Sequence, residues 1–128
     1  SATSLPTQQS VKAYVDDEVS TLATKGQWVG VNTQTGTTYT LVIGDKGKVV
    51  EMNNGSSNTC TVPPNSSVAF PVGSRLAVTR YGAGSTTIVA GSGVTLRSEG
   101  SGLAITGQYG VVEIYKRATD EWVVYGDI

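Results

Sequence analysis

The chain has 128 residues, of which 38% are hydrophobic and 15% charged, and its net charge is −1. This length suits one domain with a single core, and the low charge argues against a disordered segment. The nine Lys and Arg residues are scattered singly or in pairs, so no basic stripe is present for a nucleic-acid partner. No apolar run is long enough to cross a bilayer.

The first predicted element is a helix over residues 7–24. Thr7 follows Pro6 as the candidate N-cap, and Lys25-Gly26 supplies the C-terminal stop. Four apolar residues at helical spacing form one stripe: Val11, Val15, Val19 and Leu22. A helix this rich in valine is marginal alone, so its stripe must be buried against the β-domain or against copies of itself. The spacing predicts a short, nearly straight bundle and does not decide between a dimer and a trimer.

From Trp28 onward the hydrophobic period changes to two, which predicts half-buried strands. Turn residues separate these runs. Gly44-Asp45-Lys46-Gly47 predicts a hairpin between two of them, and Pro63-Pro64 interrupts the pattern. Strands at roughly 8–12-residue spacing favour a sandwich or barrel. We see no convincing helix after residue 26 and no long internal repeat.

The predicted fold is therefore all-β: an antiparallel β-sandwich or barrel, jelly-roll-like, preceded by one short N-terminal α-helix. Residues 1–26 form the helical connector, and residues 27–128 form the β-sandwich domain. Alternation places Tyr39, Trp28 and Trp122 in the core. The single cysteine, Cys60, lies between two threonines and is interpreted as a small buried residue, because no disulfide or CxxC metal site can form.

Catalytic chemistry has little support in this sequence. Histidine is absent, which removes the Ser-His-Asp triad, histidine acid–base catalysis and most zinc sites. A glycosidase needs two carboxylates that face one cleft, and Glu51 with Glu113 is the pair that could meet across a sheet. Nothing distinguishes those two from ordinary strand surface residues. We expect no enzyme activity, no cofactor and no metal.

Aromatic side chains are the remaining resource for binding. Tyr81 and Tyr109 lie next to glycines at the predicted edges of loops, where their rings could be exposed. An exposed ring face packs on the apolar C–H groups of a sugar, while amides bond its hydroxyls. These two tyrosines are the candidate glycan-binding residues, although ordinary packing at a strand end explains each of them singly.

Several segments resemble tail fibres, tailspikes and other virion structural proteins of tailed bacteriophages. The ten residues from Thr7 to Asp16 resemble a helical connector found before distal β-structured domains in that family. The β part is similar in its composition and turns, at Tyr39 to Ile43, Val62 to Ser67 and Phe70 to Gly73. The last seven residues, Trp122 to Ile128, match the Trp-x-x-x-Gly-Asp ending of fibre chains.

The resemblance implies a non-catalytic terminal domain that forms a homotrimer and contacts a receptor on the host surface, often a glycan. It also implies a protein made in the host cytoplasm and located in the phage tail of the virion, without membrane insertion. Residues 1–26 would then be the trimerisation stem, with Val11, Val15, Val19 and Leu22 as the expected trimer interface. Two alternatives remain open: a monomeric carbohydrate-binding module of a bacterial enzyme, and a glycan hydrolase that uses carboxylates.

Overall fold

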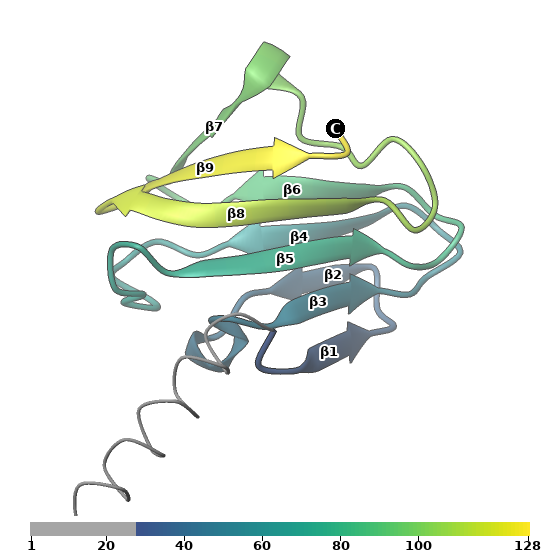
Figure 1. Ribbon diagram of the computed structural model, residues 1–128, viewed down its shortest axis with the longest axis horizontal. Coiled ribbons are helices and arrows are strands. Elements are labelled where there is room, and N and C mark those ends of the chain that lie inside the picture. The colour runs from purple at the N-terminus through teal and green to yellow at the C-terminus, as the bar shows by residue number, and fades with distance from the viewer. Residues whose placement is uncertain (1–27) are drawn as a thin grey trace, which may run out of the picture.

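The computed structural model describes residues 28–128, which fold into two β-sheets that face each other (Figure 1). One sheet has six strands in the order β1-β3-β5-β8-β9-β7, and the other has three in the order β2-β4-β6. The strands are β1 (Val31–Gln34), β2 (Thr38–Thr40), β3 (Val49–Met52), β4 (Asn58–Val62), β5 (Arg75–Arg80), β6 (Thr86–Ala90), β7 (Thr95–Ser98), β8 (Val111–Ala118) and β9 (Glu121–Gly126). Two 3-10 turns, Ile43–Asp45 and Glu99–Ser101, are the only helical elements in this part of the chain.

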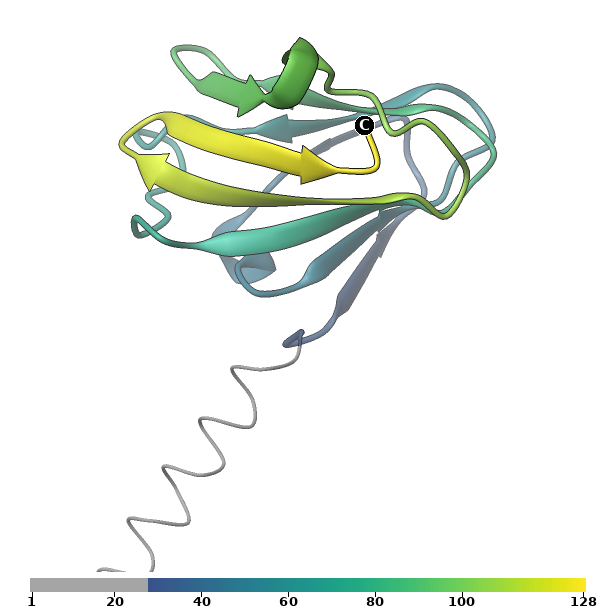
Figure 2. The same ribbon diagram turned by 45° about the horizontal axis from the view of Figure 1, so that its top comes forward.

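The first six strands alternate between the two sheets, so the chain winds around the core (Figure 2). β1, β3 and β5 lie side by side in parallel, and so do β2, β4 and β6. Each strand therefore pairs with the strand two positions along the chain. Val31 lies beside Val49, and Val49 beside Ala77, so the first winding is shorter than the second. Windings of unequal length explain why the sequence shows no repeat.

The C-terminal third closes this wound structure. β8 and β9 form an antiparallel hairpin, and the hairpin lies between β5 and β7 in the six-stranded sheet. β7 pairs in parallel with β9. At the other sheet, Ala104 bridges to Thr87, and Ile88 and Leu103 share a backbone hydrogen bond of 2.8 Å. The segment around Ala104 thus covers the edge of β6.

The structure confirms the all-β class and corrects the predicted antiparallel pairing. Among the strand pairs of residues 28–128, five are parallel, and only β5–β8 and β8–β9 are antiparallel. The predicted hairpin at Gly44-Asp45-Lys46-Gly47 was wrong for the same reason, since this turn carries the chain from β2 in one sheet to β3 in the other. Parallel strands need a long crossover, and for the parallel pairs among β1 to β6 the crossover contains a strand of the opposite sheet.

The core lies between the sheets and holds most of the predicted inward-facing residues. Trp122 is 1% exposed, and the Phe70 ring meets it edge-on with centroids 5.3 Å apart. Cys60 is fully buried, as predicted, and burial raises the pKa of its thiol to about 12. The prediction that Trp28 lies in the core was wrong. Trp28 is half-buried outside the core, and the Arg75 guanidinium lies 4.9 Å from the centroid of its ring.

Tyr39 packs against the core as predicted, and its hydroxyl joins a polar network in the first winding. The hydroxyl donates to Asp45 Oδ2 at 2.6 Å, and the Asn32 amide donates to Oδ1 of the same carboxylate at 2.8 Å. The Val42 backbone N–H also donates to Oδ2. Burial, followed by the bond to Asp45, raises the pKa of Tyr39 well above its usual range. Asp45 is 1% exposed, and these three donors offset the cost of burying it.

The turns that join the two sheets stack closely at one end of the molecule. Asn54 follows β3, and its side-chain amide donates to the Thr35 carbonyl in the winding before it. Its own carbonyl accepts the Gly84 backbone N–H at 2.9 Å, in the winding after it. A Cβ added to Gly84 would lie 2.0 Å from the Ser56 carbonyl oxygen. Glycine at this position therefore lets two backbones approach.

The predicted helix over 7–24, the connector 1–26 and the expected trimer interface (Val11, Val15, Val19 and Leu22) lie outside the described residues.

Candidate glycan-binding surface

The fold brings Tyr81 and Tyr109 together. Tyr81 directly follows β5, and Tyr109 lies in the loop just before β8. Because β5 and β8 are antiparallel neighbours, the end of one strand lies beside the start of the other. The two rings meet edge-to-face, with centroids 5.5 Å apart and an interplanar angle of 79°. Their exposures of 43% and 63% leave a two-ring surface open to solvent.

Backbone hydrogen bonds fix the position of this tyrosine pair. Tyr109 N–H donates to the Arg80 carbonyl at 2.5 Å, and Arg80 N–H donates to the Gly110 carbonyl at 3.0 Å. The Gln108 side-chain amide donates to the Tyr81 carbonyl at 3.2 Å. Tyr109 has a φ of +69°, the left-handed region, which turns its ring toward Tyr81. The backbone of both tyrosines is therefore held by the adjoining ends of β5 and β8.

Arg80 supports the loops on both sides of the pair. Its Nη2 donates to the Ala83 carbonyl at 2.6 Å, in the loop that begins with Tyr81. Its Nη1 reaches the Ile105 carbonyl at 3.5 Å, while Nε is buried without a hydrogen-bond partner in the described part of the chain. The guanidinium is thus occupied mainly in holding backbone, and we assign it a supporting role beside the rings.

A second aromatic pair lies on the outer face of β8 and β9, and the sequence interpretation missed it. Tyr115 and Tyr125 are 39% and 46% exposed, with ring centroids 6.2 Å apart. The Tyr125 hydroxyl donates to Glu113, and this bond is the main cause of a raised pKa at Tyr125. The alternation of hydrophobic residues could have revealed this pair, because both tyrosines lie on the side of their strands opposite Ile114 and Trp122.

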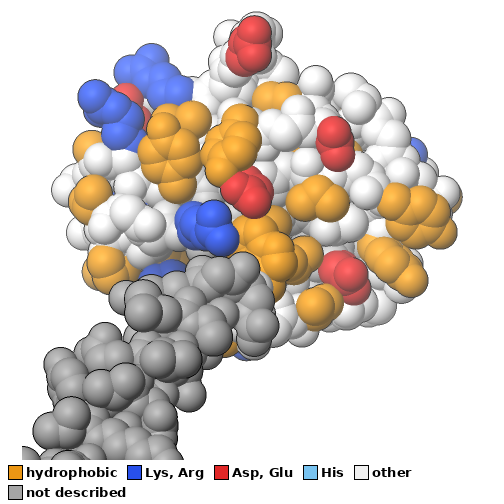
Figure 3. Space-filling model, in the orientation of Figure 1, with side chains coloured by type: hydrophobic (Ala, Val, Ile, Leu, Met, Phe, Trp, Pro, Cys, Tyr) orange, Lys and Arg blue, Asp and Glu red, His pale blue; other side chains and the backbone are white. Residues whose placement is uncertain are grey.

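The face that carries this second pair mixes hydrophobic side chains with charged ones (Figure 3). A hollow of about 180 Å³ adjoins Tyr125, lined also by Glu99, Gly126 and Ile128. Ligand pockets usually enclose about 300–1,000 Å³, so this hollow is small for an enclosed ligand. The exposed tyrosine rings offer a larger surface for binding than this hollow.

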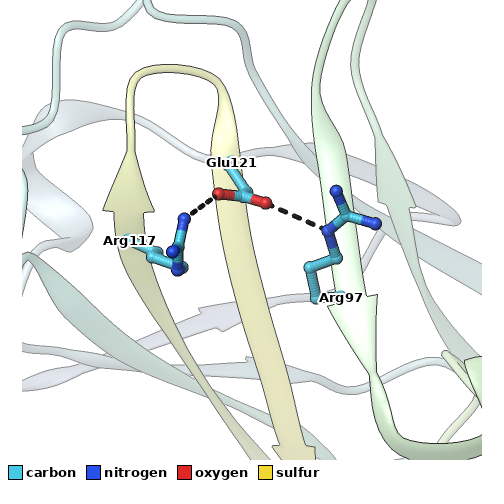
Figure 4. A network of polar contacts seen from close by, with 3 residues as sticks. All are labelled: Arg97, Arg117 and Glu121. Carbon is cyan, nitrogen blue, oxygen red and sulfur yellow. Dashed lines mark hydrogen bonds and ion pairs between the residues drawn. The ribbon is translucent and has the colours of Figure 1, made fainter.

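Charges on this sheet are paired with one another near β7. Glu121 receives hydrogen bonds from Arg97 Nε at 3.0 Å and from Arg117 Nη1 at 2.5 Å (Figure 4). Both bonds lower the pKa of Glu121, and the bond from Arg97 has the larger effect. The network joins β7, β8 and β9 across their outer face. Exposed ion pairs contribute little to stability individually. We therefore interpret the role of this network as aligning β7 with the β8–β9 hairpin.

Glu51 and Glu113, the carboxylates considered for hydrolysis, lie on the outer face of the same sheet. Their neighbours Val50 and Ile114 point into the core, and β5 runs between their strands. Glu51 accepts a hydrogen bond from Thr33 at 3.2 Å, and Glu113 accepts one from Tyr125. Each carboxylate is therefore engaged by a neighbouring strand.

Within residues 28–128, no group of three or more His, Cys, Asp or Glu side chains could hold a metal ion. The same part of the chain contains no helix long and apolar enough to cross a membrane. Comparison with known proteins finds no matching family model, no matching curated protein and no matching solved structure.

Proposed function

We propose that this chain is a terminal domain of a bacteriophage tail fibre or tailspike, which forms a homotrimer and binds a host-surface glycan without cleaving it. The resemblance of the segment from Thr7 to Asp16 and of the C-terminal ending to such proteins supports the virion assignment. The exposed Tyr81–Tyr109 pair carries the proposal of glycan binding, since two rings held by a sheet offer apolar faces to a sugar.

The arrangement of polar groups also favours recognition over cleavage. Gln108 lies beside the rings and can bond sugar hydroxyls through its amide. Glu51 and Glu113 are engaged on an open sheet face and are separated by β5. Retaining and inverting hydrolases instead hold two carboxylates on either side of one scissile bond.

Removing both rings should strongly weaken glycan binding. We expect Tyr81→Ala/Tyr109→Ala to lose about tenfold in affinity for each ring on a host-glycan array. The matched control is Tyr115→Ala/Tyr125→Ala, which removes the other exposed pair and should leave the binding profile unchanged. An unchanged profile in the first variant would reject the Tyr81–Tyr109 pair as the ligand site, and loss in the control alone would move the site to β8 and β9.

The oligomeric state tests the fibre assignment separately. Light scattering after size exclusion should give a mass near three times 13.3 kDa for the full chain. A variant that lacks residues 1–26 should become monomeric if Val11, Val15, Val19 and Leu22 form the interface. A truncated protein that remains trimeric would place the assembly in the β-domain. A monomer in both cases would contradict the fibre assignment and favour the free carbohydrate-binding module.

A further inference from the structure

Lys116 is a buried amine on the core face of β8. Val112, Ile114 and Lys116 alternate inward on this strand, and Lys116 is only 2% exposed. Its Nζ donates to Oδ1 of Asn65 at 2.6 Å and to the Phe70 carbonyl at 2.7 Å. Neither ion pair in the described part of the chain includes this lysine. A buried ammonium without a counter-ion is costly, and conversion of the amine to an amide would remove that cost.

Asn65 is held in place opposite that amine. It follows Pro63-Pro64, which restrict the backbone, and its own N–H donates to Asp120 Oδ1 at 2.6 Å. Asp120 occupies the turn between β8 and β9 with a φ of +57°. The carboxamide carbon of Asn65 is one C=O bond, about 1.2 Å, from the oxygen that contacts Nζ. The nucleophilic nitrogen and an amide carbon are therefore already in contact range.

The surroundings of this contact are apolar. Lys116 lies opposite Trp122 in the β8–β9 ladder. The Phe70 ring packs edge-on against that tryptophan, and the Phe70 carbonyl orients Nζ. An uncharged amine is the form that attacks a carbonyl, and the amide that results carries no charge, which suits an apolar site.

We propose that Lys116 and Asn65 form an intramolecular isopeptide bond. Neutral Nζ attacks Cγ of Asn65 and the new C–N bond forms. The Cγ–Nδ2 bond breaks, Nδ2 takes up the proton that Nζ loses, and ammonia leaves. Nothing is oxidised or reduced, and the product amide is uncharged. Asp120 is the positioning residue, because it holds the Asn65 backbone while the side chain reacts.

This bond would tie the loop after β4 to β8 across 51 residues of sequence. A covalent link over such a distance restricts the unfolded chain much as a disulfide does, although this chain has only one cysteine. The inference does not depend on glycan binding or on the oligomeric state.

The mass of the purified, fully denatured protein tests the proposal. We expect the wild type to weigh less than its sequence by one molecule of ammonia. Lys116→Arg and Asn65→Ala should each keep the full mass calculated from their sequences. Trypsin should release peptide 49–75 joined to peptide 98–117, and tandem spectra should locate the link at Lys116. A wild-type protein with its full sequence mass after long incubation in the folded state would overturn the proposal.

Two controls make this result specific. Asn54-Gly55 can also lose ammonia by closing to a succinimide, but that loss would persist in Lys116→Arg and would join no peptides; ammonia loss of this kind alone overturns the proposal. Asp120→Asn keeps an acceptor oxygen and tolerates the left-handed backbone, so we expect full cross-linking. Asp120→Ala should leave less than half of the protein cross-linked. Equal loss in both Asp120 variants would overturn the positioning role.

Discussion

Replacing Trp122 with alanine should lower the free energy of unfolding by about 3–5 kcal/mol. Trp122 is 1% exposed and fills the space between the hairpin and the opposite sheet. Alanine there would leave a cavity and remove the edge-on contact with Phe70. It would also remove the apolar wall beside Lys116, whose strand pairs with this position. The neighbours are strand residues fixed by backbone ladders, so the cavity can collapse only in part.

Urea denaturation, monitored by circular dichroism, measures this effect. Circular dichroism does not need Trp122 as the reporter. The matched control is Val123→Ala on the same strand, where the side chain points to the other face and is half-buried. That variant should lose less than about 1 kcal/mol. Similar losses in the two variants would show that Trp122 does not anchor the core in the way described.

Gly84→Ala should lower the free energy of unfolding by about 1–3 kcal/mol or more, because the added Cβ would clash with the backbone of another turn. The added Cβ would lie 2.0 Å from the Ser56 carbonyl oxygen and 2.3 Å from its carbon. Backbone cannot rotate away as a side chain can, so the turn after β3 would have to move. That movement would also break the bond from Gly84 N–H to the Asn54 carbonyl.

Gly55→Ala is the matched control for this turn. Gly55 lies in the same stack of turns, has no atom within 4 Å of an added Cβ and has no left-handed backbone. Its substitution should change stability by less than about 1 kcal/mol. Thermal unfolding of both variants beside the wild type makes the comparison. Equal stability of Gly84→Ala and the wild type would mean that the two turns are not in contact in solution.

Alternation of hydrophobic residues predicted the strands well and their partners poorly. Val112, Ile114, Trp122 and Val124 are all buried, as a period of two requires. The same pattern results whether a strand pairs with the next strand or with the one after it. The turn at Gly44–Gly47 therefore resembled a hairpin, although it joins two sheets. Ile43 continues the alternation of Tyr39 and Leu41 in the sequence, yet it lies in a 3-10 turn and is 53% exposed.

Local sequence predicted the features of the candidate site that depend on one residue only. Glycine neighbours correctly suggested that Tyr81 and Tyr109 are exposed. Their contact depends on the pairing of β5 with β8, which no local pattern contains. Alternation alone could have singled out Lys116, because it falls on the same inward-facing side of its strand as Ile114, where a lysine is unusual. Its contact with Asn65, 51 residues earlier, could come only from the fold.

The insertion of β8 and β9 between β5 and β7 has a consequence during synthesis on the ribosome. When residues up to Ala90 have emerged from the ribosome, β5 and β6 both present unprotected edges, because their covering segments have not yet emerged. Unpaired edges attract strands of other chains. A fragment that ends after β6 should therefore be prone to aggregation, and the segment from β7 to β9 protects the strands that precede it.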